Sequence, residues 1–137
     1  FKAGSLSSIR DFLSKRKDMM KLLNYEDSYV FFKIGEGGHK GVENINLTPR
    51  HSLATDRSII RTGAVTLFDV SKTKKGSDSC SGTTSMAIAQ DTGGAIIGAH
   101  VDWFQGDGAK AGAMADAMNN PGTIYVAVPK RKGQGCD

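Results

Sequence analysis

The chain has 137 residues, of which 39% are hydrophobic and 23% are charged, with 17 glycines and three prolines. A chain of this size and composition folds as one domain with its own core, which argues against a disordered chain and against a fold that depends on metals or disulfides. The net charge of +4 is compatible with an anionic polymer as partner, but an ordinary soluble surface is the favoured interpretation.

Residues 5–24 are expected to form the first element, a helix. Apolar side chains recur at spacings of three and four, and Ser8 with Asp11 forms a possible capping box. The basic side chains fall largely off the apolar stripe. We therefore favour a helix packed on its own domain, with a solvated charged face, over a helix that binds a membrane surface.

Six short strands are expected to follow, separated by glycine-rich or polar loops. They cover residues 28–34, 50–55, 64–70, 86–90, 100–104 and 123–128, with a polar loop over 71–84 and an Ala-rich helix over 107–119. This pattern predicts a mainly β protein, a small barrel with helical additions. We divide the chain into an N-terminal helical segment (1–27), a barrel (28–130) and a basic tail (131–137).

The cysteines and histidines show no spacing that is typical of a metal site. Cys80 and Cys136 are far apart, and the sequence leaves open whether they form a disulfide or stay free thiols. His39, His51 and His100 are scattered. We predict neither a metal nor a cofactor.

Asp91 stands at the end of an apolar strand and is followed by a glycine-rich turn that contains Gly93 and Gly94. Glycines let the backbone adopt conformations closed to other residues, and they let a ligand approach closely. A plain turn, in which Asp91 accepts hydrogen bonds from loop amides, is an equally good interpretation.

Asp102 lies within the apolar run Val-Asp-Trp-Phe of residues 101–104. Apolar surroundings raise the pKa of a carboxylic acid, which is what a general acid near neutral pH needs. Strand alternation offers another interpretation, in which Asp102 points outward while Val101 and Trp103 point inward. A third acid, Asp56, precedes Arg57, and on local sequence alone the two form a weak surface pair.

Other catalytic patterns are missing from the sequence. It has no Gly-x-Ser-x-Gly elbow and no phosphate-binding glycine fingerprint, and Cys80 has no obvious base partner.

Taken in order, the motifs resemble the three-aspartate (3D) domain of the membrane-bound lytic murein transglycosylase A family. Residues 89–96 read Ala-Gln-Asp-Thr-Gly-Gly-Ala-Ile, 101–106 read Val-Asp-Trp-Phe-Gln-Gly, and 121–129 read Pro-Gly-Thr-Ile-Tyr-Val-Ala-Val-Pro. The upstream pieces around residues 28–33 and 47–57 agree, so the resemblance runs from about residue 5 to residue 129.

This resemblance implies a six-stranded double-psi β-barrel with Asp56, Asp91 and Asp102 at one end. The family's catalytic acid falls in the motif that Asp102 occupies. The implied reaction cleaves the β-1,4 bond between N-acetylmuramic acid and N-acetylglucosamine in peptidoglycan without water, and it leaves a 1,6-anhydro sugar.

One acid can suffice for this reaction because the sugar's own C6 hydroxyl is the nucleophile, so no second carboxylate has to activate water. Asp102 is expected to protonate the leaving oxygen and then to take the proton of the C6 hydroxyl. Asp91 is expected to keep Asp102 protonated or to stabilise the oxocarbenium charge, and Asp56 to orient the site.

Four further residues are expected to contact the sugar: Gly93, Gly94, Trp103 and Gln105. For Phe104, core packing is the favoured interpretation.

Two departures from the family pattern concern substrate contacts. Ile97 stands where the family usually has lysine, and residues 60–63 read Ile-Arg-Thr-Gly instead of the usual Ile-Pro-Leu-Gly. The family binds glycan between the barrel and a second domain, and this domain and an early barrel segment precede the part seen here. We therefore expect a fragment, a cleaved product or a reduced relative.

Two alternatives to an enzyme of this family stay open. One is a double-psi barrel that binds wall polysaccharide without cutting it. The other is an aspartic protease signature at 91–93, which would require a homodimer to supply the second acid.

The predicted partner is the peptidoglycan glycan strand, with no role for nucleic acid. The resemblance implies a periplasmic parent protein, attached to the outer membrane by a lipid on an N-terminal part that precedes Phe1. The chain begins with Phe1 rather than Met and shows no signal-peptide pattern, which indicates a processed or trimmed product.

Overall fold

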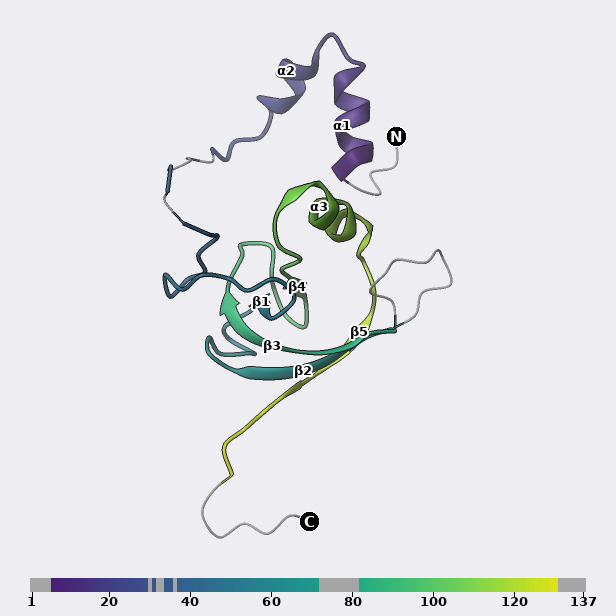
Figure 1. The fold of residues 1–137 in the computed structure, drawn as a ribbon. Coiled ribbons are helices and arrows are strands. Elements are labelled where there is room, and N and C mark those ends of the chain that lie inside the picture. The colour runs from purple at the N-terminus through teal and green to yellow at the C-terminus, as the bar shows by residue number, and fades with distance from the viewer. Residues whose placement is uncertain (1–5, 30, 32–33, 36, 72–81, 131–137) are drawn as a thin grey trace. The chain divides into compact units, whose positions relative to one another are not determined.

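The computed structural model describes residues 6–29, 31, 34–35, 37–71 and 82–130. The chain divides into two compact units, Phe1–Gly37 and Gly38–Asp137, which are coloured purple to blue and blue to yellow in Figure 1. Both cysteines, most of the predicted polar loop at 71–84 and the basic tail fall outside the described residues.

The first unit contains two short helices, α1 (Leu6–Ser14) and α2 (Met19–Leu23), where the sequence predicts one. Between them, Arg16 makes a bidentate ion pair with Asp18. Side chains two residues apart do not face each other on a helix, so this pair requires the non-helical backbone that separates α1 from α2. The predicted capping box is also wrong, because α1 begins at Leu6 and Ser8 lies inside it.

The predicted strand at residues 28–34 is wrong for the residues that are described. Residues 28, 29, 31 and 34 have no strand conformation, and the rings of Tyr29 and Phe31 are 79% and 87% exposed. Aromatic and β-branched residues favour strands mainly because they pack against neighbouring strands. No described strand pairs with this segment, so composition alone was not sufficient.

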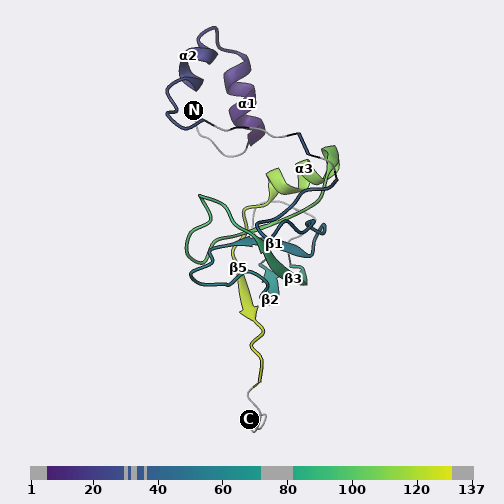
Figure 2. The same ribbon diagram turned by 90° about the vertical axis from the view of Figure 1, so that its left-hand side faces the viewer.

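The second unit is built on one five-stranded sheet, in the order β4-β1-β3-β2-β5. Its strands are β1 (Ser52–Thr55), β2 (Val65–Val70), β3 (Thr84–Asp91), β4 (Val101–Trp103) and β5 (Gly122–Val126). All five correspond to predicted strands. The sheet is curled, as Figure 1 and Figure 2 show, which confirms the mainly β class.

The sheet mixes the two directions of pairing. β1 runs parallel to β3, whereas β1–β4, β2–β3 and β2–β5 are antiparallel pairs. A parallel pair needs a long crossover connection, here residues 56–83, which include β2. The carboxyl ends of β1 and β3 therefore reach the same edge of the sheet.

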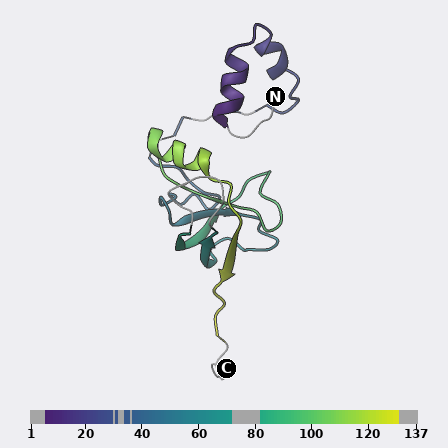
Figure 3. The same cartoon turned by 90° about the vertical axis from the view of Figure 1, so that its right-hand side faces the viewer.

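The core lies on the concave face of the sheet. Alternate residues of each strand point into it, and the buried cluster contains Leu53, Phe68, Val70, Ala87 and Trp103. Helix α3 (Gly108–Ala117), predicted over 107–119, lies over this face (Figure 3). Its Met114, with Met118 just beyond its end, packs against the buried cluster.

Among the residues that the structure describes, no helix is both long enough and apolar enough to cross a bilayer.

Candidate functional site

The three predicted acids lie at one edge of the curled sheet. Asp56 follows the last residue of β1, and Asp91 is the last residue of β3. Asp102 is the second residue of β4, which is antiparallel to β1 and therefore begins at the edge where β1 ends. The structure brings together residues that are up to 46 positions apart in the sequence.

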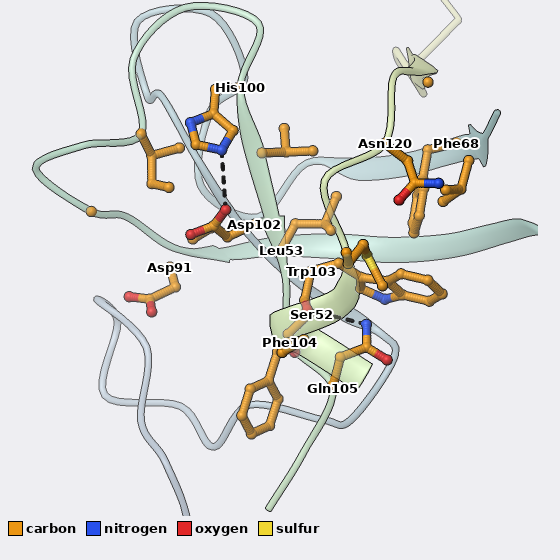
Figure 4. A pocket seen from close by; sticks show the side chains of 18 of the residues that line it. Ser52, Leu53, Phe68, Asp91, His100, Asp102, Trp103, Phe104, Gln105 and Asn120 are labelled. Atoms are coloured by element: carbon orange, nitrogen blue, oxygen red, sulfur yellow. Dashed lines mark hydrogen bonds and ion pairs between the residues drawn. The ribbon is translucent and has the colours of Figure 1, made fainter. Parts of the chain in front are cut away.

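The register places Asp91 and Asp102 on either side of the same residue. Ala54 in β1 pairs with Asp91 of β3 and with Asp102 of β4. Residues paired across adjacent strands point to the same face. Since neighbouring strands lie about 4.8 Å apart, the Cα atoms of the two acids are roughly 10 Å apart. Figure 4 shows both acids in the same pocket.

A bulge at Gln90 makes the Asp91 side chain point to the same face of the sheet as Asp102. Leu53 pairs with Ala89 and Ala54 pairs with Asp91, so Gln90 is the extra residue in β3. Strict alternation would place Asp91 on the core face with Ala89. Bulges commonly re-aim side chains next to active sites, and this one turns Asp91 to the face that carries Asp102.

Hydrogen bonds to Gln90 hold the bulge in place. The Ser52 hydroxyl donates to the Gln90 side-chain oxygen at 2.6 Å, and the Val42 amide donates to the Gln90 carbonyl at 3.1 Å. Gly41 passes so close that an added Cβ would lie 2.1 Å from the same carbonyl oxygen. These supporting residues were missed at the sequence level, because nothing in the local pattern marks a bulge.

Asp56 ties two loops together. One carboxylate oxygen accepts a hydrogen bond from the Gly98 amide at 2.8 Å, and the other accepts from the Ser58 amide at 2.9 Å and its hydroxyl at 2.7 Å. The Gly98 amide, followed by the two Ser58 donors, holds the pKa of Asp56 below its ordinary value. The predicted surface pair with Arg57 is not what engages this carboxylate.

Of the two interpretations left open for Asp102, the outward-pointing one is confirmed, and enclosure by apolar groups is wrong. Its side chain is 65% exposed, while Trp103 is 9% exposed. Strand alternation explains the difference, because adjacent residues point to opposite faces. The carboxylate instead meets His100, whose Nε2 lies 3.2 Å from the Asp102 Oδ1 (Figure 4).

A pocket of about 850 Å³ adjoins the acids. Six of the residues predicted for the site line it: Asp91, Asp102, Gly93, Gly94, Trp103 and Gln105. Asp56 does not line the pocket, but it accepts a hydrogen bond from Gly98, whose loop includes the lining residues Ala99 and His100. Gly93 makes a turn with Ile96, whose amide donates to the Gly93 carbonyl at 2.9 Å.

The two aromatic residues of this motif exchange their expected positions. Trp103 belongs to the core and packs edge-to-face on Phe68, with 5.0 Å between ring centroids. Phe104, for which core packing was expected, is half-buried, lines the pocket and contacts the ring of His39. The Gln105 side chain donates a hydrogen bond to the Trp103 carbonyl at 3.2 Å. Gln105 also lines the pocket, next to Phe104 in the sequence.

Within the described ranges, no group of three or more His, Cys, Asp or Glu side chains is placed to hold a metal ion. The three histidines contact different partners: His39 pairs with Asp107, His51 bonds the Met86 carbonyl, and His100 meets Asp102.

Comparison with known proteins shows which protein family has a similar sequence. Residues 51–128 match the model of the 3D domain. The chain is 36% identical over 111 residues to membrane-bound lytic murein transglycosylase A of Escherichia coli, covering 80% of this chain and 30% of that protein. It is 33% identical over 125 residues to the protein of the same name from Vibrio cholerae, covering 88% and 34%.

Solved structures show the same similarity. The E. coli protein with bound chitohexaose matches with a TM-score of 0.78 at 32% identity, over 90% of this chain and 39% of that chain. A membrane-bound lytic murein transglycosylase from Agrobacterium tumefaciens matches with a TM-score of 0.79 at 30% identity, over 91% and 35%. The chain thus spans about a third of the length of the relatives it matches.

Proposed function

Because the chain belongs to the membrane-bound lytic murein transglycosylase A family through its 3D domain, we propose that it carries the acid-bearing part of a site that cleaves peptidoglycan glycan strands. The observation that carries the proposal is the pairing of Ala54 with both Asp91 and Asp102. This register presents two carboxylates to one pocket. A similar protein binds chitohexaose, which supports a glycan as the ligand.

In the proposed reaction, protonated Asp102 donates to the oxygen that links N-acetylmuramic acid to N-acetylglucosamine. The C1–O bond breaks, and its electron pair stays with the leaving oxygen. The C6 hydroxyl of the same muramic acid bonds to C1, and its proton goes to Asp102. No water is consumed, and the product ends in a 1,6-anhydro sugar.

The other two acids support this step in different ways. Asp91 faces the same pocket, where its negative charge stabilises the oxocarbenium character that develops at C1. Asp56 orients the loop through the Gly98 amide. In the same loop, Gly93 and Gly94 leave room for the sugar to approach the backbone. Phe104 and Gln105, rather than the buried Trp103, supply the exposed wall.

The finer features of the family belong to the same proposal. The curled sheet is part of a six-stranded double-psi barrel. The parent protein is periplasmic and held at the outer membrane by an N-terminal lipid. The relatives in E. coli and V. cholerae are named membrane-bound, which supports attachment of the parent protein.

The test is digestion of purified peptidoglycan by this chain, with mass spectrometry of the products. Wild type is expected to release anhydro-terminated fragments, and Asp102→Asn to lose about 100-fold or more of the rate, because general acid–base catalysis contributes about that much. Asp11→Asn, a matched change at an exposed acid on α1, is expected to act like wild type.

The second function consistent with the geometry is glycan binding without cleavage, which the similar protein with bound chitohexaose supports. If folded wild type retains glycan strands but releases no anhydro product, binding is the function and the enzymatic proposal fails for this chain.

A further inference from the structure

His100 and Asp102 form a pair at the pocket. His100 precedes β4 by one residue, and Asp102 is two positions further along extended backbone. Side chains two residues apart on a strand point to the same side, and the imidazole Nε2 reaches the Asp102 Oδ1 at 3.2 Å. Among the described residues, the other carboxylate oxygen of Asp102 has no such partner, so it is open to the substrate of the proposed function.

The loop before β4 sets the position of His100. Asp56 accepts a hydrogen bond from the Gly98 amide at 2.8 Å, two residues before His100. Gly98 has a φ of +73°, a conformation that favours glycine. Asp56 therefore fixes the backbone that delivers the imidazole to Asp102.

His100 also differs in charge type from the other titratable groups that line the pocket. The titratable side chains that line the pocket in the described part of the chain are Asp69 from β2, Asp91 from β3, Asp102 from β4 and His100. Three of these are acids, and Asp56 adds a fourth carboxylate at Gly98. Among the described lining residues, the imidazole is the one side chain that can carry a positive charge.

Asp102 needs such a partner because it is not enclosed. A general acid must carry its proton at the working pH, and burial in apolar surroundings is one way of retaining it. The Asp102 side chain is 65% exposed, so burial in apolar surroundings does not help it to retain a proton. In general, an imidazole retains its proton to a higher pH than a carboxyl does.

We propose that His100 is the positioning residue that holds the reaction's proton for Asp102, an inference that rests on the proposed function. The pair carries one proton before the reaction. This proton passes through Asp102 to the leaving oxygen. The proton of the C6 hydroxyl then passes through Asp102 back to the pair. One proton leaves and one returns, so no other reagent is consumed.

The test compares kcat/KM of wild type and His100→Gln between pH 5 and pH 7. Glutamine can donate a hydrogen bond to Asp102 but cannot take up a proton, so it separates positioning from proton storage. Wild-type kcat/KM is expected to fall several-fold over this range, and that of His100→Gln to fall at least about tenfold more, because a carboxyl retains its proton less well than an imidazole as the pH rises. Asp69 and Asp91 are the same in both proteins and do not contribute to the difference.

His51→Gln is the matched control, because His51 is exposed and bonds the Met86 carbonyl away from the pocket. It is expected to keep the wild-type profile. A His100→Gln profile with the wild-type slope overturns the proposal, even if the rate falls equally at every pH, because that is what a purely structural role would produce.

A spectroscopic measurement keeps this inference separate from the proposed function. The NMR signal of the His100 Nε2 is expected to shift in Asp102→Asn and to stay unchanged in Asp11→Asn. An unchanged signal in Asp102→Asn overturns the pairing whether or not the chain is active. If the signal shifts but wild type makes no anhydro product, the proposed function fails, and the proton-holding role fails with it.

Discussion

Asp56 and Asp102 have opposite surroundings at the scale of single residues. Asp56 accepts three hydrogen bonds from Gly98 and Ser58, which suits a carboxylate that stays ionised and holds a loop. Asp102 is largely exposed and meets one imidazole, which suits a group that exchanges a proton with a substrate. The different roles that we propose for the two acids follow from these different neighbours.

The lowered pKa of Asp56 predicts a pH dependence of stability. A carboxyl whose pKa is lower in the folded protein stabilises the fold above its unfolded value, here 3.8, and loses that contribution as the pH falls through the folded value. The melting temperature of wild type is expected to exceed that of Asp56→Asn from pH 5 to pH 7, with the difference shrinking as the pH falls below 3.8.

Thermal melts across this range check the prediction, with Glu43→Gln as the control at an exposed acid of another loop. A wild-type advantage that persists undiminished at the lowest pH would show that the ionised carboxylate is not its source.

The exchange of roles between Trp103 and Phe104 gives a second prediction at this scale. Trp103→Ala is expected to cost about 3–5 kcal/mol in the free energy of unfolding, because it leaves a cavity in the core. Phe104→Ala is expected to cost about 1 kcal/mol and to weaken glycan binding instead. Denaturant melts and binding to chitohexaose separate the two. Equal losses of stability would contradict the assignment of Trp103 to the core and Phe104 to the pocket.

At the scale of elements, the bulge in β3 turns Asp91 to the face of the sheet that carries Asp102. It is held from one side by Ser52 of β1 and from the other by the loop containing Gly41 and Val42. Both contacts are long-range in sequence, so the direction of Asp91 depends on segments about 40 to 50 residues upstream.

Gly41→Ala is expected to disturb this bulge. The new Cβ would lie 2.1 Å from the Gln90 carbonyl oxygen and 2.9 Å from a Leu47 methyl, so backbone must shift. We expect a loss of about 1–3 kcal/mol of stability and a lower rate of product release. In the same loop, Gly38→Ala meets nothing nearer than 3.9 Å, so a stability change beyond about 0.5 kcal/mol there would argue against the steric explanation.

The elements that were predicted correctly from sequence are those whose pattern is local. β1 to β5 and α3 have apolar periodicity that sets their type. The break between α1 and α2, where Arg16 pairs with Asp18, was missed because the apolar spacing of residues 5–24 continues across it. The predicted strand at 28–34 failed because strand conformation requires a pairing partner that composition cannot supply.

For the site, the ordered motifs predict Asp56, Asp91 and Asp102 as the acids, and the structure places all three at one edge of the sheet, while their catalytic roles stay predictions. Their geometry could not be predicted, because it depends on the parallel pairing of β1 with β3 and on the bulge at Gln90. His100 was set aside for its lack of metal-ligand spacing. Its position two residues before Asp102 on a strand was the signal that could have identified it.

At the scale of the whole molecule, residues 51–128 match the 3D domain, and the chain spans about a third of the length of the relatives it matches. The described part of the chain supplies three acids, a pocket and one pocket-lining imidazole. The division into residues 1–27, 28–130 and 131–137 stays a prediction.

The most direct measurement of the central claim is the fate of solvent oxygen. Peptidoglycan digested by this chain in heavy-oxygen water is expected to yield muramic acid ends that carry no heavy oxygen and are one water lighter than hydrolysed ends, because the C6 hydroxyl replaces water. Asp102→Asn is expected to release almost none of them. Ends that carry heavy oxygen would show hydrolysis and contradict the account.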